Sequence, residues 1–512
     1  MAALEKIKHI VVLMLENRSF DNMLGWLYDP QNPPPFNQPP SSGTFHGVSL
    51  GNLSNPSVAG PLVRVGKGTD PTAPDPDPGE PYEDVYAQVY GQKDVPILSK
   101  VPAAPTSSSN MQGFLYNYTL KCAGGQTNPS VIMNCFTSAT VPVLWSLAYN
   151  YGVCDHWFAS IPTQTLCNRS YLHAGTSSGY VDNEGGDGIL FVNDTPTIFN
   201  VMTTAGRNWK IYCASWVITS LALLTQSRLW DECASDRFAP LADFCTAAAT
   251  PGGLPEYSFI EPIYLDSLVW GPENDMHPES QPLNFDGPSN VEQGEKLLYT
   301  VYNAVRNSPD WDSTLLLILF DEHGGCYDHV CPATFPECKF AISPDGVVIP
   351  QTQPGGSGFN FDRLGVRVPA IVVSPYTDAR TVVNTVYDHT SALSTIVNCL
   401  GLPASQLGKR QIAAPDLSEA LNRTTARADL PPIPQPAGWD PSFSARLAVS
   451  SRALLHARAK PLNDLQKKIL IGAARRLSLS SARIDEASQL ATHLDADAYL
   501  MKAEAELLAK KL

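Results

Sequence analysis

Two pairs of oxygen-bearing side chains are the first sign of chemistry in this sequence, because each pair directly follows an apolar run. Glu16 and Asn17 form the first pair, and Asp321 and Glu322 form the second. Clustered carboxylate and amide oxygens repel one another unless a cation lies between them. Such oxygens suit hard divalent cations, whereas an added histidine favours zinc or other transition metals. The sequence therefore predicts a metal site; the competing interpretation is that each pair only caps a following helix.

The two apolar runs indicate how pairs so far apart in the sequence can meet. Residues 10–15 are a continuous apolar stretch, and in the segment 313–320 six apolar residues follow Ser313-Thr314; both segments are typical of strands that are buried on both faces. In an open α/β sheet, ligands bind beyond the carboxyl ends of the parallel strands. If the two runs are parallel neighbours, both pairs lie at one edge of the sheet. The Gly-Gly turn at 324–325 would let the backbone approach that edge closely.

Strand and helix patterns alternate along the rest of the chain. Residues 19–26 resemble the start of a helix, with Ser19 or Asp21 as its N-cap. Further strands are predicted at 208–215, 257–260 and 370–373, and helical spacing occurs at 141–150 and 292–305. We therefore expect an α/β fold with a mostly parallel central sheet and helices on both faces.

Two segments differ from this alternating pattern. Within a catalytic domain expected at 1–430, residues 29–110 are a Pro- and Asp-rich insertion. Three tyrosines, Tyr82, Tyr86 and Tyr90, indicate that this insertion packs as a loop framing a pocket. Trp26, Phe36 and Phe45 are candidates to line an apolar entrance with these tyrosines.

The C-terminal part changes character after a linker-like stretch at 431–441. Residues 443–512 are rich in Ala, Leu, Lys and Arg and predict a small all-helical region. One helical face carries Leu462, Leu465, Ile469, Ala473 and Leu477. This region is interpreted as an appendage packed on the core or at an oligomer interface. The alternative is a basic amphipathic element that contacts an anionic membrane.

Composition limits the class of protein. The chain has 512 residues and a net charge of −15, which disfavours a nucleic-acid binder. No apolar run approaches the roughly 18 residues that a transmembrane helix needs. The run at 10–15 is too short for a secretory signal and has no small-residue cleavage site. The sequence thus predicts a cytoplasmic protein, or one exported by a dedicated secretion system, with most of its 11 cysteines reduced.

Several motifs in order make the chain recognisable. KIKHIVVLMLENRSFDNMLG at the start resembles the opening signature of the phosphoesterase family, which contains bacterial phospholipases C, acid phosphatases and plant non-specific phospholipases C. Further matching motifs follow over about residues 7–402: TLCNR (165–169) with Gly175-Thr176, NDMHP (274–278), DEHGGCYDHV (321–330) after Trp311, RLGVRVPAIVVSPY (363–376) and YDHTSAL (387–393). No single motif decides the resemblance, but together they are specific.

The resemblance implies an alkaline-phosphatase-like fold and a metal-bound nucleophile. By this resemblance Thr165 attacks phosphorus and forms a phosphothreonine, because a bound cation lowers the pKa of a hydroxyl that is otherwise a poor nucleophile. Thr163 is the competing candidate, and Thr165 is preferred because it stands three residues before Asn168-Arg169. The implied metal ligands are Glu16, Asn17, Asp321 and Glu322, together with Thr165. The ion is divalent, with Ca²⁺, Mg²⁺, Mn²⁺ and Zn²⁺ as candidates.

The resemblance also implies roles for the remaining polar residues. His277 would contact the phosphate or protonate the leaving alcohol. Asn168 and His389 are the expected substrate-binding residues. His329 is interpreted mainly as a residue that orients the Asp321-Glu322 loop. Arg18 and Arg169 are expected either to contact the phosphoryl oxygens or to form structural ion pairs.

The sequence departs from the family in two places. Many members carry a further histidine motif before the nucleophile, but residues 47–155 contain no histidine. The family usually has Gly-Pro before the threonine, whereas this chain has Thr163-Gln164 there. The first expectation is a phospholipase C-type phosphodiesterase that releases diacylglycerol and a phosphorylated head group. The alternatives are an acid-phosphatase-like phosphomonoesterase and a catalytically silent metal- or lipid-binding protein.

Overall fold

The fold was obtained as a computed structural model, in which most of the chain is described. The described residues are 3–58, 60–91, 109–123, 127–183, 192–214, 220–232, 236–267, 271–278, 289–332, 359, 361–403, 407–441, 461–462, 464–476 and 481–511. Among them no helix is long and apolar enough to cross a membrane. The nine cysteines in this part are free thiols, whereas Cys233 and Cys338 lie outside it.

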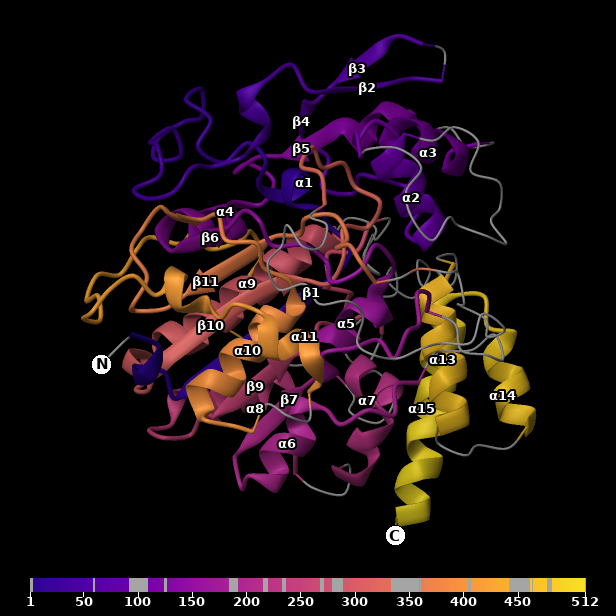
Figure 1. The fold of residues 1–512 in the computed structure, drawn as a ribbon. Helices are drawn as coiled ribbons and strands as arrows, with labels where there is room; N and C mark the ends of the chain where they lie inside the picture. Colours follow the sequence, from indigo (N-terminus) through magenta and orange to yellow (C-terminus); the bar gives the residue numbers. More distant parts are fainter. Residues whose placement is uncertain are drawn as a thin grey trace.

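One large sheet organises the molecule (Figure 1). Its strands lie in the order β12 (Thr381–Val383), β6 (Gly152–Cys154), β11 (Ala370–Val373), β10 (Thr314–Phe320), β1 (His9–Leu15), β9 (Tyr257–Ile260), β7 (Trp209–Tyr212) and β8 (Phe238–Ala239). Strand β11 runs antiparallel to both of its neighbours, and the other pairings in this sheet are parallel. The predicted fold class, a mostly parallel sheet, is confirmed.

Strands β1 and β10 form the centre of the core. Every residue of β10 is buried, and all of β1 after His9 is buried. Side chains of a strand alternate between the two faces, so this burial requires both faces to be covered. The surrounding helices pack in two groups. In the first group, α9 (Asn290–Arg306) packs against α4 (Pro142–Asn150) and α8 (Leu241–Ala249). In the second group, α5 (Thr165–Ala174) packs against α6 (Ile198–Thr204), α7 (Leu221–Thr225) and α10 (His389–Leu400).

Short elements after β1 and in the insertion cover one end of the sheet (Figure 1). Helix α1 (Phe20–Leu24) begins after Ser19, whose hydroxyl accepts a hydrogen bond from the Asn22 amide, so Ser19 is the N-cap. The elements of the insertion and its neighbours are η2 (Val48–Leu50), β2 (Ser54–Pro56), β3 (Leu62–Arg64), β4 (Gly66–Gly68), α2 (Tyr82–Tyr90), α3 (Phe114–Lys121) and β5 (Asn134–Phe136). Tyr82, Tyr86 and Tyr90 are buried in this layer, as expected for a packed segment.

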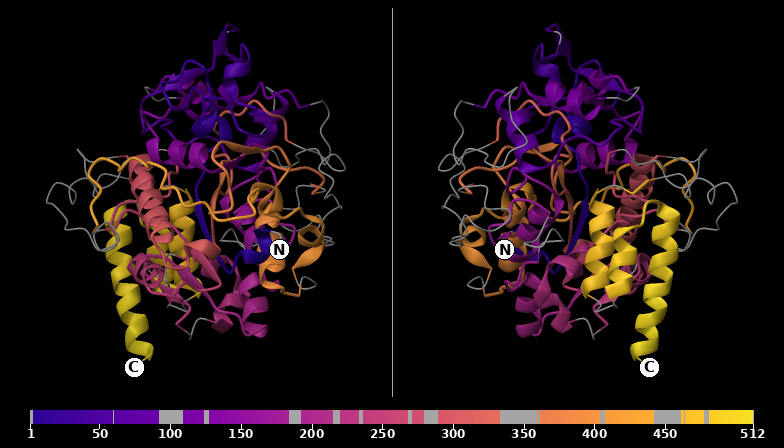
Figure 2. Two further views of the ribbon diagram at one scale, coloured as in Figure 1. Left: turned by 90° about the vertical axis from the view of Figure 1, so that its left-hand side faces the viewer. Right: turned by 90° about the vertical axis from the view of Figure 1, so that its right-hand side faces the viewer.

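The C-terminal helices lie together on one side of the molecule (Figure 2). They are α13 (Asp464–Arg476), α14 (Ser481–Ser488) and α15 (His493–Lys511). Ile469 and Ala473 of the predicted apolar face are buried, and α13 packs against α7. The Gln466 side-chain amide donates to the Tyr264 carbonyl at 3.0 Å. The apolar face of α13 is therefore used for packing; the burial of Leu465 and Leu477 lies outside what the structure describes.

Candidate active site

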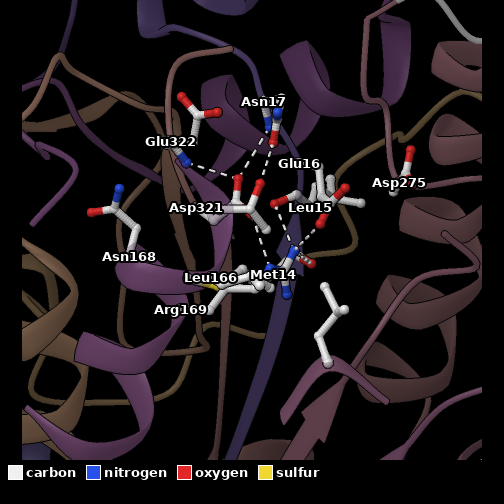
Figure 3. A network of polar contacts seen from close by, with 12 residues as sticks. Met14, Leu15, Glu16, Asn17, Leu166, Asn168, Arg169, Asp275, Asp321 and Glu322 are labelled. Carbon is white, nitrogen blue, oxygen red and sulfur yellow. Dashed lines mark hydrogen bonds and ion pairs between the residues drawn. The ribbon is translucent and has the colours of Figure 1, made fainter. Parts of the chain in front are cut away.

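The carboxyl ends of β1 and β10 bring the two predicted pairs together. Leu15 pairs with Phe320 at the last position of the two parallel strands, so Glu16 and Asp321 follow at the same edge. The backbone amide of Asn17 donates to Asp321 Oδ1 at 3.1 Å. Figure 3 shows these side chains gathered above the end of β1. The pairing of β1 with β10 therefore brings together the two pairs of residues, about 300 positions apart in the sequence, as predicted.

The turn after β1 has an unusual backbone. Asn17 has a φ of 57°, in the left-handed region that asparagine tolerates better than most residues. Gly324 has a φ of 60°, and a Cβ placed on it would lie 1.9 Å from the Asn17 carbonyl oxygen. Only glycine fits such a contact. The predicted close backbone approach at the Gly-Gly turn is therefore present, and it is made to Asn17.

Thr165 is joined directly to this edge. It is the first residue of α5, is fully buried, and its hydroxyl donates to Asn17 Oδ1 at 3.2 Å. The hydroxyl of Thr163 instead donates to the Val181 carbonyl. A helix N-terminus carries partial positive charge and favours phosphate groups. The geometry places Thr165, and not Thr163, beside Asn17 where an anionic substrate would be stabilised.

Arg169, one turn further along α5, is the cation of the site. Its Nε donates to Asp321 Oδ2 at 2.9 Å, and its Nη2 lies 3.3 Å from Glu16 Oε1. Its Nη1 donates to the Tyr264 hydroxyl at 2.9 Å. Burial alone would lower the pKa of Arg169, but its acidic neighbours outweigh burial and raise it. Arg169 was expected either to contact the phosphoryl oxygens or to form structural ion pairs, and the structure shows the ion pairs.

Arg169 does not neutralise all the acidic groups at this edge. Burial raises the pKa of Glu16 well above its usual range against the lowering effect of Arg169. Burial, followed by the charge of Glu80, raises the pKa of Glu322 in the same direction. Within the described part of the chain, Glu322 Oε1 is buried without a hydrogen-bond donor, and Glu16 Oε1 has the ion pair with Arg169 but no hydrogen bond. Figure 3 shows Glu322 on the opposite side of Asp321 from Arg169.

The loop insertion contributes two acidic residues that sequence reasoning missed. The Asn17 side-chain amide donates to Glu80 Oε1, and Asn17 Nδ2 also lies 2.9 Å from His277 Nε2. Burial and the neighbouring Asp77 raise the pKa of Glu80 to about 8, although His277 opposes this. Asp77, Glu80 and His277 offer ligand atoms that all lie within 4.8 Å of one another. The available signal was the acidic DPDPGE run, which looked like ordinary loop sequence.

His277 is placed with a defined tautomer. Its Nδ1 lies 2.8 Å from the Pro278 carbonyl, which can only accept, so Nδ1 carries the proton. Its Nε2 is then the acceptor for Asn17 Nδ2, with Glu80 Oε1 at 3.4 Å. The structure therefore joins His277 to Asn17, and Asn17 to Thr165. An imidazole nitrogen in this position can exchange a proton with a reacting oxygen that takes the place of Asn17 Nδ2.

Two other predicted residues hold the scaffold in this structure. The Asn168 amide nitrogen donates to the carbonyls of Thr163, at 2.8 Å, and Gln164, at 3.2 Å, and so fastens the loop before α5. His389 is fully buried, and its Nε2 lies 2.6 Å from the Asp321 carbonyl oxygen. Both residues thus support the nucleophile loop and the acidic edge. Their predicted contact with substrate stays a prediction.

His329 and Arg18 lie next to the site. His329 Nδ1 is 2.6 Å from Asp21 Oδ2 at the start of α1, and its predicted orienting of the Asp321-Glu322 loop stays a prediction. Arg18 Nε donates to the Met276 carbonyl at 2.7 Å, directly before His277. In the described residues, three His/Asp/Glu groups have the spacing for a metal: Asp77 with Glu80 and His277, Asp21 with Asp328 and His329, and Asp155 with His46 and His156. The group of Asp77, Glu80 and His277 adjoins the predicted metal site through Asn17.

The chain is similar to known proteins in sequence and, distantly, in structure. The sequence model of the phosphoesterase family matches residues 7–403. The chain is 34% identical over 439 residues to non-specific phospholipase C3 of Arabidopsis thaliana, covering 83% of this chain and 75% of that protein. It is 28% identical over 461 residues to phospholipase C B of Mycobacterium tuberculosis, covering 82% and 78%. The solved phosphonate monoester hydrolase of Silicibacter pomeroyi is a distant likeness, with 12% identity and a TM-score of 0.28 over 57% of this chain and 73% of that one.

Proposed function

Because this chain belongs to the phosphoesterase family and is a hydrolase of phosphoester bonds, we propose that it cleaves glycerophospholipids in the manner of a phospholipase C. The relatives named non-specific phospholipase C support this substrate class. The single observation that carries the mechanism is the hydrogen bond from Thr165 Oγ1 to Asn17 Oδ1, at the N-terminus of α5. This contact supports Thr165 as the nucleophile, because the helix N-terminus and a cation held at the acidic edge would both favour a phosphate beside that hydroxyl.

The donor set fits a divalent cation. All five predicted ligands bear hard oxygen donors, and Glu322 Oε1 is buried with no hydrogen-bond donor among the described residues. Glu16, Asn17, Asp321, Glu322 and Thr165 would hold the ion. Bound there, it would lower the pKa of the threonine hydroxyl and offset phosphate charge. Arg169 already pairs with Glu16 and Asp321, so its role is to hold these two carboxylates in position.

The residues of the chain account for both halves of the reaction. The Thr165 hydroxyl gives up its proton to solvent and its Oγ attacks phosphorus, the bond to the glycerol oxygen breaks, and diacylglycerol leaves with a proton from the imidazolium form of His277. Glu80, whose Oε1 lies 3.4 Å from Nε2, stabilises that imidazolium. In the second half, His277 Nε2 takes a proton from water as the water attacks the phosphothreonine. The phosphorylated head group leaves, and Thr165 Oγ takes a proton from solvent, which restores its hydroxyl.

A substrate panel tests this proposal. The purified protein is assayed for head-group release from vesicles of single phospholipids and for hydrolysis of a chromogenic phosphomonoester. Each assay is run before and after chelation, and again after metal is restored. We expect lipid turnover that chelation abolishes and metal restores. Turnover of the monoester but not of any lipid would replace the proposal with a phosphomonoesterase. Inactivity of the metal-restored protein on both substrates would favour a silent binding protein.

A further inference from the structure

A second group of potential metal ligands lies outside the site described above. His46 comes from the insertion, and Asp155 and His156 directly follow β6. His46 Nδ1 lies 3.2 Å from Asp155 Oδ2, and His156 Nδ1 lies 2.8 Å from Asp155 Oδ1. Two imidazole nitrogens from separate segments thus converge on one carboxylate. Neither histidine belongs to the motifs that carry the family resemblance.

The donor types and spacing fit a transition-metal dication. Two imidazoles and a carboxylate form a donor set that zinc uses widely. With metal–ligand bonds of about 2.0–2.2 Å, neighbouring donor atoms of a tetrahedral site lie about 3.3 Å apart. The observed nitrogen–oxygen separations of 3.2 and 2.8 Å differ little from that value. All three ligand atoms lie within 4.8 Å of one another, so a metal that replaced the two N–H···O contacts would draw the two rings closer together.

Exposure leaves room for entry and for a further ligand. The Asp155 side chain is fully buried, whereas the side chains of His46 and His156 are 40% and 20% exposed. The two rings are nearly perpendicular, at 88°, with centroids 4.8 Å apart, so they do not stack on each other. A metal held between them would have one side open to water. This arrangement suits three protein ligands and a solvent molecule.

The surroundings hold the ligands in place. Asn384 Nδ2 donates to Asp155 Oδ1 at 2.7 Å, and the His46 amide donates to Asp155 Oδ2 at 2.8 Å. The buried Arg367 donates through Nη1 to the main-chain oxygens of His46, at 3.1 Å, and Asp155, at 2.8 Å. Supporting hydrogen bonds of this kind orient metal ligands before the metal arrives.

The neighbouring Asp21–Asp328–His329 group differs from the His46–Asp155–His156 group in its contacts with Arg367. Arg367 Nη2 donates to Asp21 Oδ1 at 2.9 Å, and Arg367 Nε donates to Asp328 Oδ1 at 3.0 Å. A guanidinium therefore already serves as the cation between those carboxylates, and they balance its charge. At Asp155 the same arginine contacts only main-chain oxygen, so the carboxylate itself faces the two histidines.

We propose that His46, Asp155 and His156 bind a transition-metal dication of the Zn²⁺ type, which fastens the insertion to the end of β6. This ion is separate from the one proposed at Thr165. His46 lies in the segment that precedes η2, and its ligation would tie that segment to the sheet through Asp155. Binding would therefore add to the stability of the folded chain, because the unfolded chain does not hold the three ligands together.

Zinc stoichiometry tests the proposal in the full-length protein. The protein is stripped of metal, dialysed against buffered micromolar Zn²⁺, and analysed for bound zinc per chain. His46→Gln and His156→Gln each remove one ligand, and both side chains are partly exposed. His9→Gln is the control, because His9 Nδ1 contacts only the Pro255 carbonyl among the interactions described. We expect each ligand variant to bind one zinc fewer than the wild type, and the control to match the wild type.

Thermal unfolding gives a second readout that does not depend on activity. Adding Zn²⁺ to the stripped protein should raise the Tm of the wild type and of the control by more than it raises the Tm of either ligand variant. Circular dichroism confirms that each variant is folded, and the second variant serves if one of them is not. Equal zinc content and equal Tm increases in all four proteins would overturn the proposal and leave a hydrogen-bonded His–Asp–His cluster without metal.

Discussion

The Thr165 hydroxyl donates to the side-chain oxygen of Asn17, 148 positions away in the sequence, at 3.2 Å. The first residue of α5 thereby meets the turn that ends β1. Asn17 also donates from its side-chain amide to Glu80 and lies beside His277. One asparagine thus connects the proposed nucleophile, the proposed proton carrier and the loop insertion.

Thr165→Ala should lower kcat on phospholipid by roughly 10³-fold or more, because no other hydroxyl is described beside Asn17. Thr163→Ala should change kcat far less, since the Thr163 hydroxyl donates to the Val181 carbonyl. Thr165→Ser should keep measurable activity. Mass spectrometry of acid-quenched enzyme should find the phosphorylated peptide around residue 165 in the wild type and in the active variants, but not in Thr165→Ala. Similar rates for the Thr165→Ala enzyme and the wild type would refute the nucleophile assignment.

Glu80→Ala should reduce kcat/KM by about 10- to 100-fold, the usual cost of removing a group that orients a ligand residue. The Asn17 amide would lose its acceptor, and the imidazolium of His277 would lose a nearby carboxylate. Glu80→Gln keeps an oxygen that can accept from Asn17, so we expect a smaller loss. Steady-state kinetics on one phospholipid separates the two variants. Equal losses in both would show that the charge of Glu80, and not its acceptor oxygen, is what matters.

Gly324→Ala should destabilise the protein and abolish activity, because the new Cβ would lie 1.9 Å from the Asn17 carbonyl oxygen. Gly401→Ala is a matched control: both glycines have a φ of 60°, but a Cβ on Gly401 meets nothing within 4 Å. The control should lose about 1 kcal/mol through left-handed strain alone. Gly324→Ala should lose roughly 2 kcal/mol more through overpacking. Urea unfolding measures the difference, and equal losses would mean that the turn relaxes without disturbing Asn17.

Glu295 makes stability depend on pH at a place remote from the chemistry. Burial raises the pKa of this carboxyl to about 8, although it accepts hydrogen bonds from the Val143 and Leu144 amides at the start of α4. The folded protein therefore holds a proton that the unfolded chain releases near pH 4.5. This contribution to stability is fully present below pH 4.5 and is lost as the pH rises to about 8, by up to about 1.4 kcal/mol per pH unit.

Glu295→Gln should remove that dependence, because glutamine does not titrate. Urea unfolding of both proteins at several pH values between 5 and 8 measures the effect. The stability of the variant relative to the wild type should increase steadily across this range, whatever its value at pH 5. A constant difference between the two proteins would show that Glu295 has an ordinary pKa in the folded state.

Much of the site could be predicted because its signals are local. The apolar runs before Glu16 and Asp321 and the motif around Thr165 are contiguous in the sequence, and burial on both faces follows from their composition. Because β1 and β10 are parallel neighbours that end at the same level of the sheet, Glu16 and Asp321 must lie at one edge. The role of Gly324 was also readable, because a glycine pair after an active-site strand indicates close backbone contact.

The contributions of Glu80 and Arg169 could not be read in the same way. Glu80 lies in a Pro-Asp-rich loop where acidic residues are common and usually solvated, and only folding of the insertion buries it against Asn17. Arg169 had two equal interpretations until its distances to Glu16 and Asp321 were known. Likewise, Asn168 matched a substrate-binding position, but its amide is used by the carbonyls of its own loop.

By itself, the sequence determined the sheet, its buried central strands, the family and the identity of the reactive edge, because short-range patterns of apolar and polar residues encode these features. Only the tertiary structure decided which charges face each other. Whether a carboxylate meets an arginine, a histidine or an amide depends on contacts between segments far apart in the chain, and those contacts set the pKa values, the tautomer of His277 and the partners of Thr165. The same reason explains why the His46–Asp155–His156 group appears only in the folded protein.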